Sequence, residues 1–536
     1  MLMRSPSVRG EPIGKGIVEF NLVDERWLPC AEMDGKPVEL SITEALVRSH
    51  ELRELRDSSP LTTAALHRLL LAVIHSAYRG PQSVAAWRAL WSAGRADQKM
   101  LGDYLVKWHD RFNLFDASHP FYQVAGFSID ATRPACQLEQ EIARGNNATL
   151  FDHTTEASSP ALTSARAARA LVTNQAYAVG GGNGSTSALF GKHPNLKHAP
   201  LVAGITVLLK GETLFETLML NLLLLTAEAP IPCEKDDAPA WERSQGIQHP
   251  GERPVRGWLD LLTWQSRCIS LIEKDDRVSE MYYAQGNSLS KTSAREPMWF
   301  YRESKKPGEY LPVRLCSERA VWRDVDSLLT IRPDRAGETR PRAFRQINHI
   351  IAEDDTGIRP GNSWRCSLMG LENDKALVLR WTQEDLPLHP QLLEDSSILE
   401  HLRVGMEKCE SAASALRTAE WVSCSKFLVP EDVGRTVDRD TVRSLTERVR
   451  AQELFWSDMS GPFRHFMEDV AVNPGLALTR WLETVKRTAY VSFAQSADTR
   501  FGRSARGLRA RVEGDRVLAG ELTKAGLGSA ANGGEV

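Results

Sequence analysis

The hydrophobic pattern of the chain changes near Pro390, and this change constrains the possible fold more than any other feature. From about Phe20 to Trp381, short alternating runs typical of strands are mixed with amphipathic stretches typical of helices, such as Thr62 to Ala77. After Pro390, apolar residues recur at helical spacing and almost no strand pattern remains. The sequence therefore predicts an α+β protein, with a large mixed α/β N-terminal domain followed by a C-terminal four-helix bundle.

The helical pattern covers three stretches: Leu392 to Val422, Asp438 to Val470 and Leu476 to Ala494. The middle stretch is long enough for two helices, which we expect to be broken near Gly461-Pro462 because proline interrupts a helix. The predicted organisation is an N-terminal extension over residues 1–19, the mixed domain over 20–385, the bundle over 386–498 and a basic, partly disordered tail over 499–536.

Arginines in the expected tail recur mostly at three-residue spacing, which would place a cationic stripe on one side of a helix. They are Arg500, Arg503, Arg506, Arg509, Arg511 and Arg516. Gly502 and Gly507 would each weaken such a helix by about 1 kcal/mol. A frayed basic tail and a nucleic-acid-binding helix therefore remain alternatives.

Two apolar stretches, Leu201 to Leu209 and Leu214 to Leu225, are too short for the ~18–20 apolar residues that cross a bilayer. They predict a buried strand, a Lys-Gly-Glu turn and a core helix. The N-terminus is basic but has no apolar signal segment, so we expect a cytoplasmic protein without a membrane partner.

Charge and cysteine usage limit the classes of function. The 536 residues carry 66 Lys+Arg against 69 Asp+Glu, a net charge of −3, so strong binding to phosphate would depend on local patches. The eight cysteines form no CxxC pair, and the histidines form no HxxxH or HExxH motif. We therefore expect reduced thiols, no metal and no cofactor.

Motifs for catalysis are missing from the sequence. It contains no GxSxG elbow, no GxxxxGK[ST] loop and no GxGxxG between a clear strand and a helix. The acidic pairs Asp236-Asp237, Asp275-Asp276 and Asp354-Asp355 fall in polar connectors, which favours solvated loops. These observations favour a binding or scaffolding protein over an enzyme.

A glycine-rich segment follows Asn174, in which Gly180, Gly181 and Gly182 are succeeded by Gly184. Without Cβ atoms, such a backbone can come within hydrogen-bonding distance of a flat or ridged partner. A flexible surface turn, a phosphate cradle and a loop against a nucleic-acid groove are all open on composition. For a phosphate-binding enzyme loop, Lys192 comes too late in the chain.

Five sequence blocks occur in an order that resembles the CasA large-subunit family of the type I-E CRISPR Cascade surveillance complex. They are FNLVDERWLPC (20–30), RFNLFDASHPFYQ (111–123), NNATLFDH (146–153), NQAYAVGGG (174–182) and MGLENDKA (369–376). The resemblance implies a non-catalytic subunit that recognises the PAM in target double-stranded DNA from the minor groove and helps open the duplex. It also implies three further partners: the other Cascade subunits, the guide RNA and the helicase-nuclease.

The resemblance assigns roles to individual residues. Gly180, Gly181 and Gly182 match the family's loop against the PAM minor groove. A second DNA loop matches a segment that comprises Asn373, Asp374, Lys375 and Ala376. There Ala376 would face the base edges, and Lys375 would replace the family's glutamine as the wedge between base pairs. An ordinary hairpin turn is the alternative at this position.

Other residue assignments from the resemblance are less direct. Phe151 matches an aromatic residue of a loop that engages the guide end of the complex, and Arg277 is the nearest basic residue to a family lysine that reaches the PAM. No CxxC pairs occur where some relatives hold zinc. Two rival interpretations remain: a nucleotide- or nucleic-acid-processing enzyme with a Gly-rich phosphate loop, and a purely structural scaffold.

Overall fold

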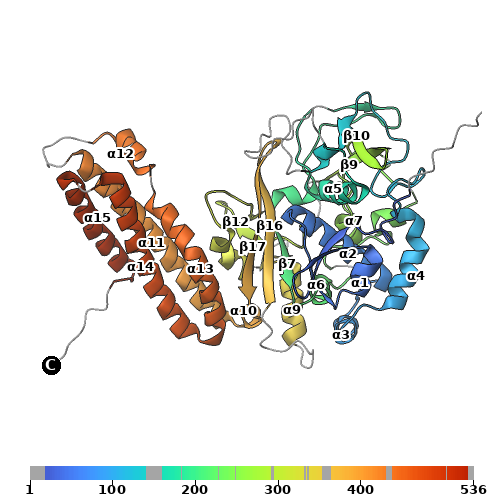
Figure 1. Ribbon diagram of the computed structural model, residues 1–536. Coiled ribbons are helices and arrows are strands. Elements are labelled where there is room, and N and C mark those ends of the chain that lie inside the picture. Colours follow the sequence, from blue (N-terminus) through green and yellow to red (C-terminus); the bar gives the residue numbers. More distant parts are fainter. Residues whose placement is uncertain are drawn as a thin grey trace, which may run out of the picture.

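The structure is a computed structural model of the chain. It describes residues 19–139, 160–182, 184–226, 229–244, 246–247, 249–290, 295–330, 333–334, 337–352, 364–429, 437–448, 450–502 and 504–528. Figure 1 shows two parts, a mixed helix-and-strand part that ends with strand β17 and a C-terminal part made of helices. The predicted α+β fold class is therefore confirmed. The long β16–β17 hairpin lies toward the side of the mixed part that faces the helical part, and β12 lies beside it on that side.

The strands of the mixed part form small antiparallel sheets, with one parallel pair, β8 with β11. The larger sheets have the orders β2-β1-β3, β4-β10-β9 and β17-β16-β7. The strands in these sheets are β1 (Leu28–Glu32), β2 (Pro37–Leu40), β3 (Leu52–Leu55), β4 (Arg133–Pro134), β7 (Thr206–Lys210), β9 (Arg267–Lys274), β10 (Arg277–Gln285), β16 (Trp364–Asp374) and β17 (Leu377–Leu388). The paired short strands are β5 (Thr186–Ser187), β6 (Gly191–Lys192), β8 (Gly251–Arg253), β11 (Asn287–Leu289), β12 (Tyr301–Glu303), β13 (Tyr310–Pro312), β14 (Pro333–Asp334) and β15 (Gly337–Glu338).

Helices cover these sheets and connect them. The α-helices of the mixed part are α1 (Ile42–Val47), α2 (Pro60–Tyr78), α3 (Val84–Ser92), α4 (Gln98–Trp108), α5 (Ser164–Tyr177), α6 (Leu214–Asn221), α7 (Trp258–Leu262), α8 (Val325–Leu329) and α9 (Arg342–Ala352). Short 3₁₀ turns are η1 (His109–Phe112), η2 (Ala135–Leu138), η4 (Pro200–Ala203), η5 (Ala240–Glu242) and η6 (Val321–Asp324). The predicted strand, turn and helix after Leu201 are β7 and α6.

Helix α2 is the centre of the mixed part. Ser59 caps its first turn by accepting a hydrogen bond from the Thr62 amide, Pro60 occupies the first helical position, and Arg79 ends the helix in the left-handed conformation. Residues 61–75 of α2 are all buried, so the helix is surrounded by other elements on every side. It packs against α5, α4, α7 and strand β16.

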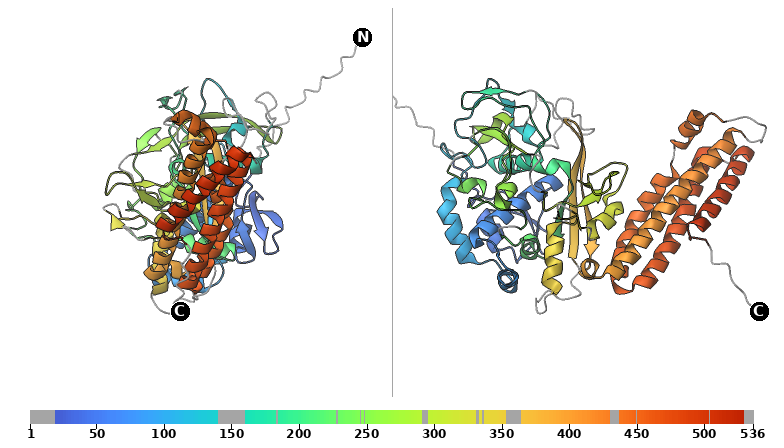
Figure 2. Two further views of the ribbon diagram at one scale, coloured as in Figure 1. Left: turned by 90° about the vertical axis from the view of Figure 1, so that its left-hand side faces the viewer. Right: turned by 180° about the vertical axis from the view of Figure 1, so that it is seen from behind.

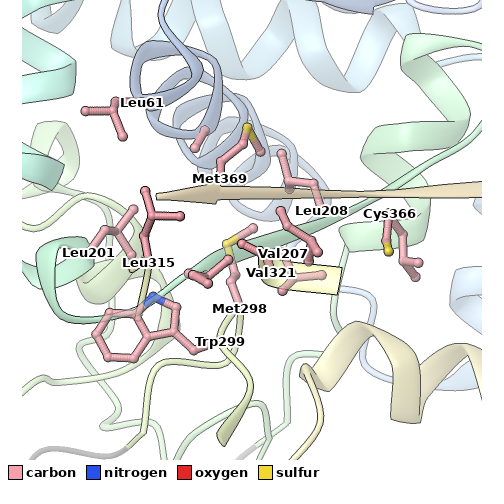
Figure 3. Packing of buried hydrophobic residues seen from close by; sticks show 14 of the residues in the cluster. Leu61, Leu201, Val207, Leu208, Met298, Trp299, Leu315, Val321, Cys366 and Met369 are labelled. Carbon is pink, nitrogen blue, oxygen red and sulfur yellow. The ribbon is translucent and has the colours of Figure 1, made fainter. Parts of the chain in front are cut away.

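Apolar side chains of the β17-β16-β7 sheet pack into the core around α2. Figure 3 shows Val207 and Leu208 of β7 and Met369 of β16 in one cluster with Leu61 of α2. Trp299 closes the cluster against Gly204, where an added Cβ would lie 2.5 Å from the indole ring. The β16–β17 hairpin is therefore anchored in the core at one end, which fixes the direction in which its tip projects.

Among the described residues of the C-terminal part, four long helices run side by side and extend away from the mixed part, as Figure 2 shows. They are α11 (Ser396–Leu428), α13 (Ala451–Val472), α14 (Pro474–Phe501) and α15 (Ala505–Lys524), accompanied by the short helices α10 (Gln391–Glu394) and α12 (Arg439–Thr446). Two sequence expectations are corrected here. The chain between α11 and α14 breaks after Thr446, whereas Pro462 lies inside α13. The fourth long helix is α15, which the sequence analysis placed in a partly disordered tail.

The regular arginine spacing does not make a single cationic stripe. Arg500 belongs to α14 and is buried, where it donates a 2.8 Å hydrogen bond to Glu420 of α11. Arg506 donates to the carbonyls of Phe427 and Leu428 at the end of α11, and Arg511 pairs with Asp498. These arginines join helices to one another, so the expectation of a cationic stripe on one side of a helix is wrong for them.

Aromatic and ionic contacts join the two parts. Trp322 of η6 stacks on Phe463 of α13 with ring centres 4.5 Å apart. The Arg323 guanidinium lies 3.7 Å from the centre of the Trp456 ring and bonds Glu410 of α11 at 2.9 Å. Within the described part of the chain, no helix is both long and apolar enough to span a membrane.

Because Arg500 is buried, substitutions of two arginines from the same sequence pattern should have very different effects on the free energy of unfolding. We expect Arg500→Leu to lower the free energy of unfolding by about 3–5 kcal/mol, because it leaves the buried Glu420 carboxylate without its cation. The matched control Arg509→Leu, at an exposed position on α15, should change it by less than about 0.5 kcal/mol. Urea and thermal unfolding measure both. Similar losses for the two variants would contradict this account of the pattern.

Candidate functional site

Two segments that are far apart in the sequence meet at the end of the β16–β17 hairpin. One is the glycine loop, residues 178–182, which follows α5. The other is the hairpin tip, residues 374–376. A Cβ atom built on Gly181 would lie 2.6 Å from the Cβ of Ala376, closer than real Cβ atoms approach. The structure thus brings together the two sets of residues that the sequence analysis singled out separately.

The hairpin tip is a two-residue turn formed by Lys375 and Ala376, between the paired residues Asp374 and Leu377. Lys375 has a φ of +53°, and the Asn373 side chain donates a 2.8 Å hydrogen bond to its carbonyl. Asp374, Lys375 and Ala376 are exposed. The hairpin-turn alternative is therefore confirmed as the local geometry, and it presents the Lys375 side chain at the end of a rigid two-stranded arm.

Each glycine of the loop has its own reason for lacking a side chain. At Gly180, a Cβ would lie 2.9 Å from the backbone of Leu196, Lys197 and His198, so the loop is packed directly on that segment. Gly181 has a φ of +139° and faces Ala376. Gly182 has a φ of +86°, is exposed and has no atom near its missing Cβ.

Arg267 of β9 holds the loop from inside. Its side chain is fully buried and donates hydrogen bonds to the carbonyls of Ala178 at 3.2 Å, Val179 at 3.1 Å and Lys197 at 2.7 Å. It also donates to the Tyr283 hydroxyl at 2.8 Å. The sequence analysis missed Arg267 because its partners are main-chain carbonyls from two separate segments and a hydroxyl from a neighbouring strand, which leave no sequence motif.

The 196–198 segment adds two further residues that the sequence analysis missed. The Gly180 amide donates to Nδ1 of His198 at 2.9 Å, and the Lys197 amide donates to Oε1 of Gln285 at 2.6 Å. Lys197 is exposed beside the glycine loop, so it offers a cation at the site. The spacing of Lys197 and His198 from Gly180 gave no signal, since only the fold makes them neighbours.

Arg277 lies elsewhere. Arg277 is the first residue of β10. Gln285, whose side chain accepts a hydrogen bond from the Lys197 amide beside the glycine loop, is the last residue of that strand. Eight residues of strand separate the two by about 26 Å. Lys197 is therefore a better-placed cation than Arg277. Phe151 lies outside the described residues.

The chain direction argues against an enzyme-type phosphate loop. Such a loop precedes a helix, whose N-terminal amides and positive dipole end face the phosphate. Here the glycine loop follows the C-terminal end of α5, where the dipole is negative, and leads to β5. Among the described residues, no three His, Cys, Asp or Glu side chains are grouped so that they could hold a metal ion.

Comparisons with known proteins identify the family to which the chain belongs. The sequence profile of the CRISPR-associated protein Cse1 family matches residues 21–491. A CRISPR-associated protein CasA/Cse1 from Thermus thermophilus is 34% identical over 523 residues, which cover 94% of this chain and 98% of the relative. The chain belongs to the CasA/Cse1 family.

Solved structures of Cse1 proteins have the same fold as this family member. Thermobifida fusca Cse1 is 25% identical, with a TM-score of 0.81 over 95% of this chain and 99% of the other. A chain of a CRISPR RNA-guided surveillance complex has a TM-score of 0.72 at 19% identity, over 93% and 99%. The resemblance that the five sequence blocks indicated is therefore confirmed at the level of the family.

The bond between Gly180 and His198 predicts a pH dependence in this Cse1-family loop. Burial and the nearby cations Arg314 and Arg267 lower the pKa of His198 below its usual 6.5, which favours the neutral ring that accepts the bond. The stabilisation is fully present above the unfolded-state pKa and declines as the pH falls below it, because the unfolded state then binds more protons.

We therefore expect amide hydrogen exchange at Gly180 to accelerate below about pH 6.5, after correction for the intrinsic rate. Mass spectrometry of the peptide that spans the glycine loop measures it. His198→Ala should remove the pH dependence and expose the amide at every pH. A corrected rate that does not change with pH in the natural chain would show that His198 does not hold the loop.

Proposed function

We propose that this CasA/Cse1-family protein is the non-catalytic large subunit of a type I-E CRISPR Cascade complex, and that its glycine loop and hairpin tip read the PAM of target DNA from the minor groove. The observation that carries the proposal is the contact between Gly181 and Ala376, since it joins both expected DNA-reading segments in one exposed edge. Family membership supports the role in a Cascade, with guide RNA and the other subunits as cytoplasmic partners.

The geometry suits a groove rather than a phosphate cradle. The minor groove is about 6 Å wide, which suits a backbone without side chains or a slender turn better than a helix. Gly182 and Ala376 are exposed and carry at most one methyl group. The few polar groups on the minor-groove floor are degenerate, so such an edge would tolerate several PAM sequences.

Charge at the site is local. Lys375 at the tip and Lys197 beside the loop are the cations that would contact phosphates, and Asp374 would repel them. In this proposal Lys197 anchors the backbone of the DNA, while Lys375 inserts at the first base pair beyond the PAM and so helps to open the duplex. Recruitment of the helicase-nuclease would follow opening, with the helical part facing the displaced strand.

A substitution at Gly181 tests the placement of the edge. We expect Gly181→Val to weaken binding of PAM-bearing duplex by the assembled complex at least about tenfold, near 1.4 kcal/mol, because the added side chain pushes the loop away from Ala376. Gly35→Val is the matched control. Gly35 also has a positive φ, +87°, but no atom lies near its missing Cβ.

Gel-shift titration with and without the PAM measures both variants. Wild-type affinity in Gly181→Val, or an equal loss in Gly35→Val, would contradict the proposed edge.

Lys375→Ala tests the wedge separately from binding. We expect this variant to slow strand opening about tenfold, as 2-aminopurine fluorescence next to the PAM would report, while initial duplex affinity falls only two- to threefold, the loss of about one phosphate contact. Lys197→Ala, which removes a cation of the same type, should show the reverse pattern. Equal loss of affinity and opening rate in Lys375→Ala argues against a wedge.

A further inference from the structure

A cavity of about 350 Å³ opens on the mixed part between the RFNLFDASHPFYQ block and the segment around η5. Residues of both segments line it, together with Leu189, Phe190 and Gln265. Neither the glycine loop nor the hairpin tip contributes to the lining. Its volume is in the range of small-molecule sites.

One wall of the cavity is aromatic. The rings of Phe121 and Tyr122 are stacked, with centres 4.4 Å apart and planes 4° from parallel. The Trp241 ring lies 6.4 Å from that of Tyr122 at 23°. These three rings are only 2–6% exposed and form the floor of the cavity, whereas the half-buried ring of Phe190, which also lines it, is more open to a planar ligand.

The backbone fixes Tyr122 in this wall at some cost. Its φ is +56°, a left-handed conformation that costs a bulky residue about 1–3 kcal/mol. Side chains on both sides hold it: Gln175 donates to the Tyr122 carbonyl at 3.2 Å, and Gln123 donates to the Leu114 carbonyl at 2.7 Å. Strain that is maintained in this way is common where a side chain must be aimed at a ligand.

The charged groups of the cavity are cationic. Arg111 and Arg243 line it with His119, whereas no Asp or Glu does. Among the described residues, Arg111 makes no ion pair or hydrogen bond through its side chain. Arg243 donates to Asp260 and to the Ala238 carbonyl, but its buried Nε has no acceptor. An unpaired arginine and a buried donor without an acceptor are the groups that an anion would satisfy.

We propose that this cavity binds a nucleotide unit, with the planar base on the aromatic lining formed by Phe190, Tyr122 and Trp241 and the phosphate between Arg111 and Arg243. Arginine suits phosphate because its fork of donors matches the phosphate oxygens. The Gln265 side chain, which also lines the cavity and has no described partner, supplies a donor and an acceptor for a base edge. The nucleotide comes either from solution or from an unpaired position of a bound nucleic acid. This site is independent of PAM reading.

Calorimetric titration of the full chain with AMP tests the site, with adenosine and inorganic phosphate as partial probes. We expect saturable binding of AMP, at least about tenfold weaker binding of each partial probe, and a loss of at least about tenfold in Arg111→Gln, the effect of one charge-assisted bond. Arg53→Gln, at an exposed arginine that does not line the cavity, is the matched control and should bind AMP normally.

Three outcomes would overturn the proposal: no saturable heat with AMP, equal affinity in Arg111→Gln, or tighter binding of an acidic aromatic peptide than of AMP. Repeating the titration on the complex assembled with guide RNA distinguishes the two sources. If the complex no longer binds AMP although the free chain does, a nucleotide of the RNA fills the cavity. If it still binds AMP, the ligand is a free nucleotide. Arg111→Gln should leave affinity for PAM duplex unchanged, so failure here does not bear on the PAM proposal.

Discussion

The buried guanidinium of Arg267 is the interaction on which the candidate DNA-reading edge depends. A charge taken out of water is costly unless it is fully hydrogen-bonded. Here the main-chain carbonyls of the glycine loop and of Lys197 satisfy it, together with the Tyr283 hydroxyl. The loop carbonyls must therefore turn inward. The Nη2 atom of Arg267 donates to all three carbonyls while its Nε donates to Tyr283, and lysine, which has a single nitrogen, could not make both sets of bonds.

The hairpin tip, which forms the other half of the edge, is held in place by different contacts. Strand β16 is paired with β7 and packed on α2, and the hairpin reaches the glycine loop only at its far end. Along its other face, β17 contacts α13 of the helical part. The loop is thus fixed by a polar network and the tip by an apolar core.

Local patterns predicted the elements that depend on local physics. The apolar spacing of residues 62–77 predicted α2, and the change in hydrophobic pattern near Pro390 predicted the helical part. The sequence analysis placed a helix break at Pro462, yet the chain turns after Thr446, because packing around Phe463 outweighs the missing amide of the proline. The arginine periodicity does not produce a single cationic stripe for a similar reason. Whether Arg500 faces water or Glu420 depends on a helix that is distant in the sequence.

The close approach of Gly181 to Ala376 has an evolutionary consequence. The contact between positions 181 and 376 has room for a single methyl group. A side chain at one position therefore requires glycine at the other. Sequences of relatives should therefore show these two columns varying as a pair, with glycine retained opposite any side chain on the hairpin. Variation at the hairpin tip is therefore expected at the neighbouring positions, Asp374 and Lys375, whose side chains are exposed.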